Sequence, residues 1–104
     1  MNKKELLLAC LSEELSEVQQ EISKCQRFST DHLYEPYGTT NIQRVQLEYA
    51  DVCAVAHLLR EEGIETHITV PDNPGPFFID RYFDKMRRTK ASYRISVELG
   101  ALQE

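Results

Sequence analysis

One long stretch of the chain decides its fold: residues 3–27 read KKELLLACLSEELSEVQQEISKCQR and contain neither Gly nor Pro. Apolar residues recur in this stretch at alternating spacings of three and four. Residues three and four apart share a helix face, so the spacing predicts one stripe of a long amphipathic helix. The stripe consists of Leu8, Leu11, Leu15, Val18, Ile22 and Cys25.

Two further helices are predicted downstream. Residues 42–62 carry a second apolar stripe, with Asn41 as a candidate N-cap and Gly63 suited to the position after the helix end. Residues 77–92 form a third amphipathic segment. The two predicted stripes consist of Val45, Val52, Val55 and Leu59 in the second helix, and Phe78, Tyr82, Phe83 and Met86 in the third.

The segments between the helices contain loop-forming residues. Residues 29–41 are predicted to be an inserted loop, and residues 64–76, which contain three prolines, a connecting loop. The tail over residues 93–104 alternates like a strand at its start, although a helical turn fits it equally well.

A chain of 104 residues fits one domain, residues 1–104, built as an all-α helical bundle. Three helices with narrow apolar stripes make a thin core. We therefore expect the bundle to be completed by self-association as a dimer or tetramer.

Charge and composition exclude several partners. The net charge of -5 argues against binding a nucleic-acid backbone, which needs a basic face. No stretch approaches the roughly 20 apolar residues of a membrane helix, and the apolar run at Leu6–Leu11 is too short for a secretion signal. Three cysteines without a CxxC pair favour reduced thiols and a cytoplasmic location.

Two pairs of carboxylates interrupt the apolar stripes. Glu14 lies between Leu11 and Val18, and Glu17 follows it three residues later. Glu48 lies between Val45 and Val52 in the same way, followed by Asp51. Both pairs are thus predicted to face a neighbouring helix.

Four carboxylates brought together at a helix contact need compensation. Protons provide it by raising the pKa values; a hard divalent cation provides it better, because carboxylate oxygens suit Mg²⁺ or Mn²⁺. Facing helices with inward acids build such sites inside bundles. The alternative interpretation is a solvated acidic face without any metal, which suits Glu13 and Glu21 in particular.

The acidic residues also resemble a known family. Glu13-Glu14-Leu15-Ser16-Glu17 followed by Glu48-Tyr49-Ala50-Asp51 is similar to the EExxE…ExxD signature of the MazG-like, all-alpha NTP pyrophosphohydrolases. The resemblance covers about residues 5–62, and the 30 residues between the two motifs are more than the family usually has.

The resemblance implies cleavage of a nucleoside triphosphate to a nucleoside monophosphate and pyrophosphate. It implies that Glu14, Glu17, Glu48 and Asp51 hold Mg²⁺, and that Glu17 or Glu13 acts as the base for the attacking water. Basic side chains should meet the phosphates, with Lys24, Arg27, Lys85 and Arg88 as candidates. Phe28 is the preferred residue for stacking on the base; the other aromatic candidates are His32, Tyr34, Tyr37 and Tyr49.

Two alternatives stay open at this point. The same acidic site would serve a hydrolase of another phosphoanhydride, such as a nucleoside diphosphate or a guanosine alarmone. A non-enzymatic helical oligomerisation module would use the stripes for contact and leave the acids solvated or setting the register.

Overall fold

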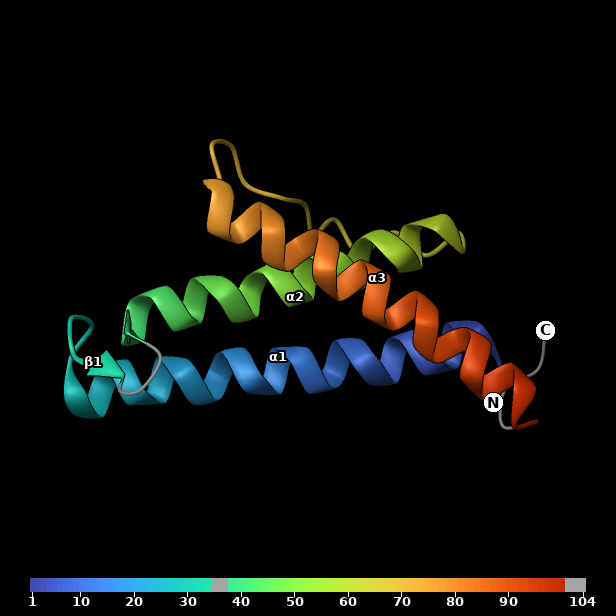
Figure 1. Cartoon of the computed structure of the whole chain (residues 1–104), viewed down its shortest axis with the longest axis horizontal. Helices are drawn as coiled ribbons and strands as arrows, with labels where there is room; N and C mark the ends of the chain where they lie inside the picture. Colours follow the sequence, from blue (N-terminus) through green and yellow to red (C-terminus); the bar gives the residue numbers. More distant parts are fainter. Residues whose placement is uncertain (35–37, 101–104) are drawn as a thin grey trace.

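Three helices make up most of the protein, and the computed structural model describes residues 1–34 and 38–100. α1 spans Lys3–Phe28, α2 spans Asn41–Glu61 and α3 spans Pro76–Glu98. α1 and α2 run antiparallel to each other, and α3 crosses α2 (Figure 1). The predicted all-α fold is confirmed.

The predicted loop over residues 29–41 contains a small hairpin. β1 (Leu33–Tyr34) pairs antiparallel with β2 (Thr39–Thr40). The buried side chain of Asn41 donates a hydrogen bond to the carbonyl oxygen of Ser29 at 3.0 Å, so the end of α1 is tied to the start of α2.

α1 and α2 each begin with a capping box. Asn2 accepts a hydrogen bond from the Glu5 amide, and the Glu5 carboxylate accepts one from the Asn2 amide. Thr40 and Gln43 form the same reciprocal pair at the start of α2. The N-cap is therefore Thr40, and the prediction of Asn41 was wrong by one residue because Thr40 supplies the capping hydroxyl.

The remaining helix ends follow from backbone conformation. Gly63 lies just beyond α2 with φ 88°, which confirms its predicted position, since this left-handed conformation favours glycine. Pro76 is the first residue of α3, where its missing N–H costs nothing. α3 continues to Glu98, so the tail is helical at its start, and residues 101–104 lie outside the described part of the chain.

The core is centred on α2, which lies against both other helices. The predicted side chains Val52, Val55 and Leu59 are fully buried. α3 buries Phe78, Tyr82 and Met86 as predicted, and it also buries Thr89 and Tyr93. Phe83 was assigned to the same face but is 58% exposed, because it lies about 100° around the helix from Tyr82.

The predicted stripe of α1 was only half right. Leu11, Val18 and Cys25 are half-buried, and Leu11 packs against the core, whereas the other three members are exposed. Leu8, Leu15 and Ile22 are 46%, 46% and 44% exposed, while the residues directly preceding each of them, Leu7, Glu14 and Glu21, are buried. Both series repeat every seven residues, and periodicity alone does not decide which one faces α2. The rotation observed brings the two carboxylates to cationic partners, described below.

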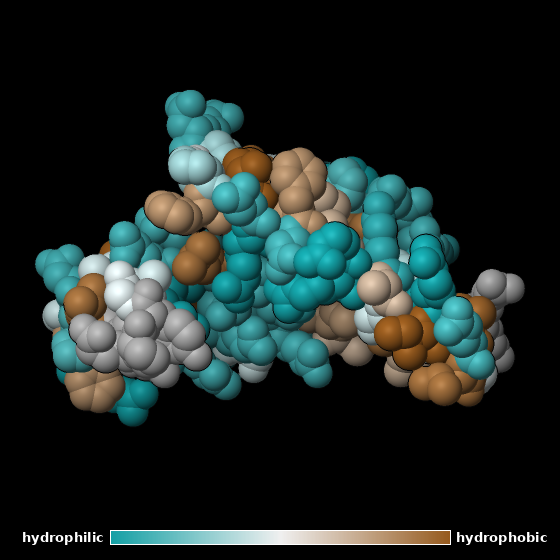
Figure 2. All heavy atoms as spheres, viewed as in Figure 1, coloured by the Kyte–Doolittle hydropathy of each residue, from teal (hydrophilic) through white to brown (hydrophobic). Residues whose placement is uncertain are grey.

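The molecule is elongated, with principal extents of 44 × 28 × 20 Å. Its radius of gyration of 15.0 Å exceeds the roughly 13 Å of a compact domain of this size. Figure 2 shows that the viewed face is mostly hydrophilic, with apolar residues gathered at the end where the N-terminus and the last turns of α3 lie. Among the described residues, no helix combines the length and apolar character needed to cross a membrane.

The register of α1 predicts opposite behaviour for two adjacent leucines. Leu7→Ala removes a fully buried side chain and should lower the free energy of unfolding by about 2–5 kcal/mol. Leu8→Ala, at a 46% exposed site, should change it by less than about 1 kcal/mol in dilute solution. Urea denaturation measures both, and equal losses would contradict this rotation of α1.

Candidate metal centre

The four acids predicted as metal ligands converge where α1 meets α2. α1 presents Glu14 and Glu17 one turn apart, and α2 presents Glu48 and Asp51 in the same way. One oxygen from each carboxylate lies within 4.8 Å of the others. Glu14, Glu48 and Asp51 are buried, at 4%, 7% and 3% exposure, whereas Glu17 opens to solvent. These four residues are called the acidic cluster below.

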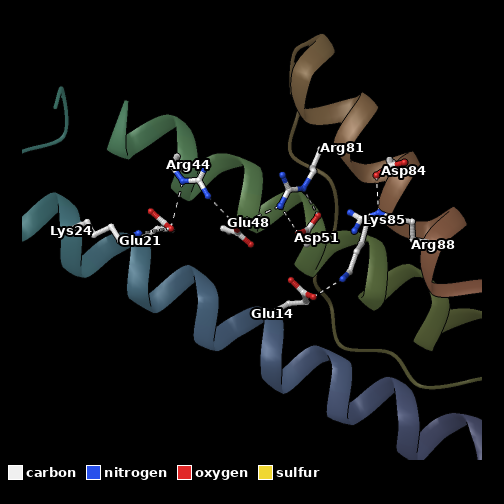
Figure 3. A network of polar contacts seen from close by, with 10 residues as sticks. All are labelled: Glu14, Glu21, Lys24, Arg44, Glu48, Asp51, Arg81, Asp84, Lys85 and Arg88. Atoms are coloured by element: carbon white, nitrogen blue, oxygen red, sulfur yellow. Dashed lines mark hydrogen bonds and ion pairs between the residues drawn. The ribbon is translucent and has the colours of Figure 1, made fainter. Parts of the chain in front are cut away.

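Two cations from α3 reach into the acidic cluster (Figure 3). Arg81 binds Asp51 with both arms of its guanidinium, Nε to Oδ1 at 2.8 Å and Nη2 to Oδ2 at 2.9 Å. Nη2 also lies 3.4 Å from Glu48 Oε1. Lys85 Nζ lies 2.6 Å from Glu14 Oε1.

Arg81 was not predicted as a site residue. It lies four residues before Lys85, so the two side chains share one helix face. That spacing is the sequence feature that identifies it. Its pairing with Asp51, however, spans 30 residues of sequence and depends on how α3 crosses α2.

A fifth acid extends the network along α1. Glu21 was assigned to the surface, but it is only 6% exposed. Its Oε1 lies 3.1 Å from Lys24 Nζ and 3.6 Å from Arg44 Nε, and Arg44 Nη2 lies 3.9 Å from Glu48 Oε1. Figure 3 shows Arg44 between Glu21 and Glu48, so a run of alternating charges leads into the acidic cluster.

The cations do not satisfy every carboxylate oxygen. Glu14 Oε2 and Glu48 Oε2 are buried and make no hydrogen bond. Burial raises the pKa of Glu14, and the charges of Asp51 and Glu17 add to this, against the opposing effect of Lys85. The pKa of Glu17 is raised too, first by burial and then by Glu48. The acidic cluster therefore holds more negative charge than the neighbouring cations neutralise.

A bound divalent cation would neutralise this excess negative charge. The donors are all carboxylate oxygens, two of them buried without partners, and hard cations such as Mg²⁺ or Mn²⁺ prefer such ligands. The residues present could thus hold a metal ion, and the buried unpartnered oxygens are the observation that supports it.

The other predicted site residues lie outside the acidic cluster. Glu13 is exposed. Arg27 stacks 5.4 Å from the ring centroid of Phe28, which is 56% exposed. Ten residues separate Arg27 from Glu17, which is about 15 Å along a helix. Arg88 is exposed and pairs with Asp84 at 2.8 Å.

The aromatic candidates are scattered. The ring of His32 lies 6.1 Å from that of Phe28, beyond the end of α1. The ring of Tyr49, on α2, lies 6.4 Å from the ring of Phe78, on α3. The side chain of Tyr34 and all of Tyr37 lie outside the described residues.

Comparisons with protein-family models, curated proteins and solved structures find no match for this chain. The resemblance to the MazG-like enzymes therefore rests on the sequence of about residues 5–62 alone, and chiefly on the two acidic motifs.

The ion pair between Arg81 and Asp51 is predicted to support folding. Arg81→Ala leaves a buried carboxylate unpaired and should lower the free energy of unfolding by about 2–3 kcal/mol, less than for a fully enclosed pair because Arg81 is partly exposed. Arg81→Lys should recover only part of the lost stability, because Lys lacks the planar guanidinium that binds both carboxylate oxygens of Asp51.

The control for this prediction is Arg87→Ala. Arg87 pairs with Asp84 on the exposed side of α3, so the loss should stay below about 1 kcal/mol. Chemical denaturation without divalent cations measures all three variants. Equal losses of stability for Arg81→Ala and Arg87→Ala would show that Arg81 does not compensate for the burial of the acids.

Metal binding is predicted to depend on the buried acids. Mg²⁺ or Mn²⁺ at about 100 times its dissociation constant should stabilise the protein by about 2.7 kcal/mol. Glu14→Gln should abolish most of this gain, whereas Glu13→Gln, one residue away and exposed, should keep it. Calorimetric titration and thermal unfolding measure the effect; no response in the unaltered protein would rule out the site.

Proposed function

We propose that this protein is a Mg²⁺-dependent nucleoside triphosphate pyrophosphohydrolase. It would convert an NTP or dNTP and water to the monophosphate and pyrophosphate. The observation that carries the proposal is a cluster of four carboxylates with buried oxygens lacking partners, placed beside two cations from a third helix. The similarity of the acidic motifs to those of the MazG-like family supports it.

The acids and the cations have separate tasks in this proposal. Glu14, Glu17, Glu48 and Asp51 would hold the metal, which when bound polarises phosphate oxygens. With their charge neutralised in this way, these acids would attract Arg81 and Lys85 of α3 less strongly.

Arg81 and Lys85 are thereby placed to meet the phosphates. Both extend from one face of α3 to the acidic cluster, so a phosphate chain bound there lies within their reach. Arg81 offers two donors to phosphate oxygens and Lys85 a single positive charge. Their role is to stabilise the charge that develops on the pyrophosphate as it leaves.

Glu17 is the preferred base for the attacking water. It is the exposed member of the acidic cluster, so water reaches it from solvent. It would accept the proton while the water oxygen bonds to phosphorus and the bond between the α and β phosphates breaks. Glu13 is the alternative base, although it lies outside the cluster.

The rival functions differ in what they require of the acids. An oligomerisation module leaves the acids solvated or uses them to set the register. The burial of three of the four disfavours solvated acids, and acids that only set the register would bind no metal. A hydrolase of nucleoside diphosphates or alarmones uses the same acids, and only the products tell it apart.

A panel of standard, deoxy and modified nucleotides tests the proposal. With Mg²⁺ the protein should release pyrophosphate, not phosphate, from at least one triphosphate, and Asp51→Asn should lower kcat/KM by about 100- to 1,000-fold, as expected for a group that organises the reacting charges. Folded, metal-loaded protein that releases no pyrophosphate from any of them would refute it.

Two neighbouring variants separate the candidate bases. At Mg²⁺ concentrations that saturate each variant, Glu17→Gln should lower kcat by about 100-fold or more, and Glu13→Gln by far less. The reverse order would assign the base to Glu13. Release of phosphate from a diphosphate, or of pyrophosphate from an alarmone alone, would move the function to those substrates.

A further inference from the structure

A cavity of about 750 Å³ lies between the start of α2 and the start of α3. The first turns of α2, the connection over residues 71–76 and the first turn of α3 line it. α3 crosses α2 further along, so its first turns stand away from the start of α2 (Figure 1). Sites for small molecules typically have volumes of about 300–1,000 Å³, so this space is large enough for one. We call it the α2–α3 cavity.

Apolar side chains form the two helical walls of the α2–α3 cavity. The ring of Phe77 is 81% exposed, so it offers an open aromatic face to a planar ligand. The rings of Tyr49 and Phe78 lie 6.4 Å apart and join the two walls. The apolar lining residues are Val45, Leu47 and Tyr49 from α2, and Phe77 and Phe78 from α3.

The polar groups of the cavity are nearly all neutral. Gln43, Gln46 and Asn73 line it, and each side-chain amide contains both a donor and an acceptor. Among the described residues that line the cavity, Asp72 carries the only charge. A phosphate or carboxylate group would meet no cation here. A flat, neutral heterocycle with donors and acceptors along its edge fits both the aromatic walls and the amides.

Both walls of the cavity lead to the acidic cluster. Asp51 follows Leu47 by four residues on α2, and Arg81 follows Phe77 by four residues on α3. Residues at this spacing share a helix face and lie about 6 Å apart along the axis. Since Arg81 and Asp51 are bound to each other at 2.8 Å, the two walls end at the same ion pair.

We propose that the α2–α3 cavity binds the base of a nucleotide whose phosphates lie at the acidic cluster, and that Phe77 stacks on this base. The pentose of the nucleotide bridges the single helical turn between the two. The inference rests on the proposed function for the identity of the ligand.

This placement differs from the one expected from the sequence. Phe28, the preferred stacking residue there, lies eleven residues after Glu17, which is about 16 Å along α1. Phe77 and the connection before it lie beyond residues 5–62, so the resemblance to the MazG-like family makes no prediction for this cavity.

Calorimetric titration of the full chain with nucleoside monophosphates in the presence of Mg²⁺ tests the proposal. The matched probe is ribose 5-phosphate, which has the pentose and the phosphate but no base. At least one monophosphate, from a panel of standard and modified bases, should bind about 10-fold or more tightly than ribose 5-phosphate, because stacking on an aromatic ring adds to its affinity.

Phe77→Ala should remove this difference in affinity, and Phe77→Trp should retain it. Binding of ribose 5-phosphate should stay unchanged in both variants, because neither alters the acidic cluster. Phe83→Ala is the matched control: Phe83 is also an exposed aromatic residue of α3, 58% exposed, but it does not line the cavity. Phe28→Ala should likewise keep the preference for the nucleotide.

Nuclear magnetic resonance locates the base without any substitution. The monophosphate should shift the amide signal of Gly75, which lines the cavity, and ribose 5-phosphate should not. Equal affinity for ribose 5-phosphate and every monophosphate would overturn the proposal. So would a preference for the nucleotide that survives Phe77→Ala or is lost in Phe28→Ala. Because these measurements need no hydrolysis, a failure to release pyrophosphate refutes the proposed function and leaves this result to be judged separately.

Discussion

Burial of carboxylates between α1 and α2 is the constraint on which the rest of the structure depends. Glu14, Glu48 and Asp51 are almost without solvent, and such groups are tolerated only beside opposite charge. α3 supplies that charge through Arg81 and Lys85, which explains why it crosses α2 at this point. The pairing is incomplete, because two carboxylate oxygens stay without partners. An arrangement that keeps excess negative charge in place is suited to receiving a metal ion.

α1 has different chemistry on its two sides. The side toward α2 carries Leu7, Glu14 and Glu21 and belongs to the polar network. The outer side carries Leu8, Leu15 and Ile22, each partly exposed. The acidic cluster therefore depends on only one side of this helix.

The sequence predicted the acidic cluster better than the packing around it. Glu14 and Glu48 stood out because each interrupts an apolar stripe, and their partners three residues on followed from helix geometry. The rotation of α1 was not predictable in this way, because buried and exposed series have the same seven-residue period. For the same reason, Glu21 was predicted to lie on the surface although it is buried. Arg81 could not be assigned to Asp51, because that contact depends on the crossing of two helices joined by a long connection.

The buried side chains of α1 determine how this helix aligns along the antiparallel helix α2. Leu7, Glu14 and Glu21 occupy equivalent places one heptad apart, about 10 Å along the axis. If α1 slid by one heptad, Leu7 would replace Glu14 beside Lys85, and that ammonium would lose its carboxylate. A purely apolar column would tolerate the slide at small cost. The alternation of one leucine with two glutamates along the buried side of α1 therefore specifies a single alignment of α1 on α2.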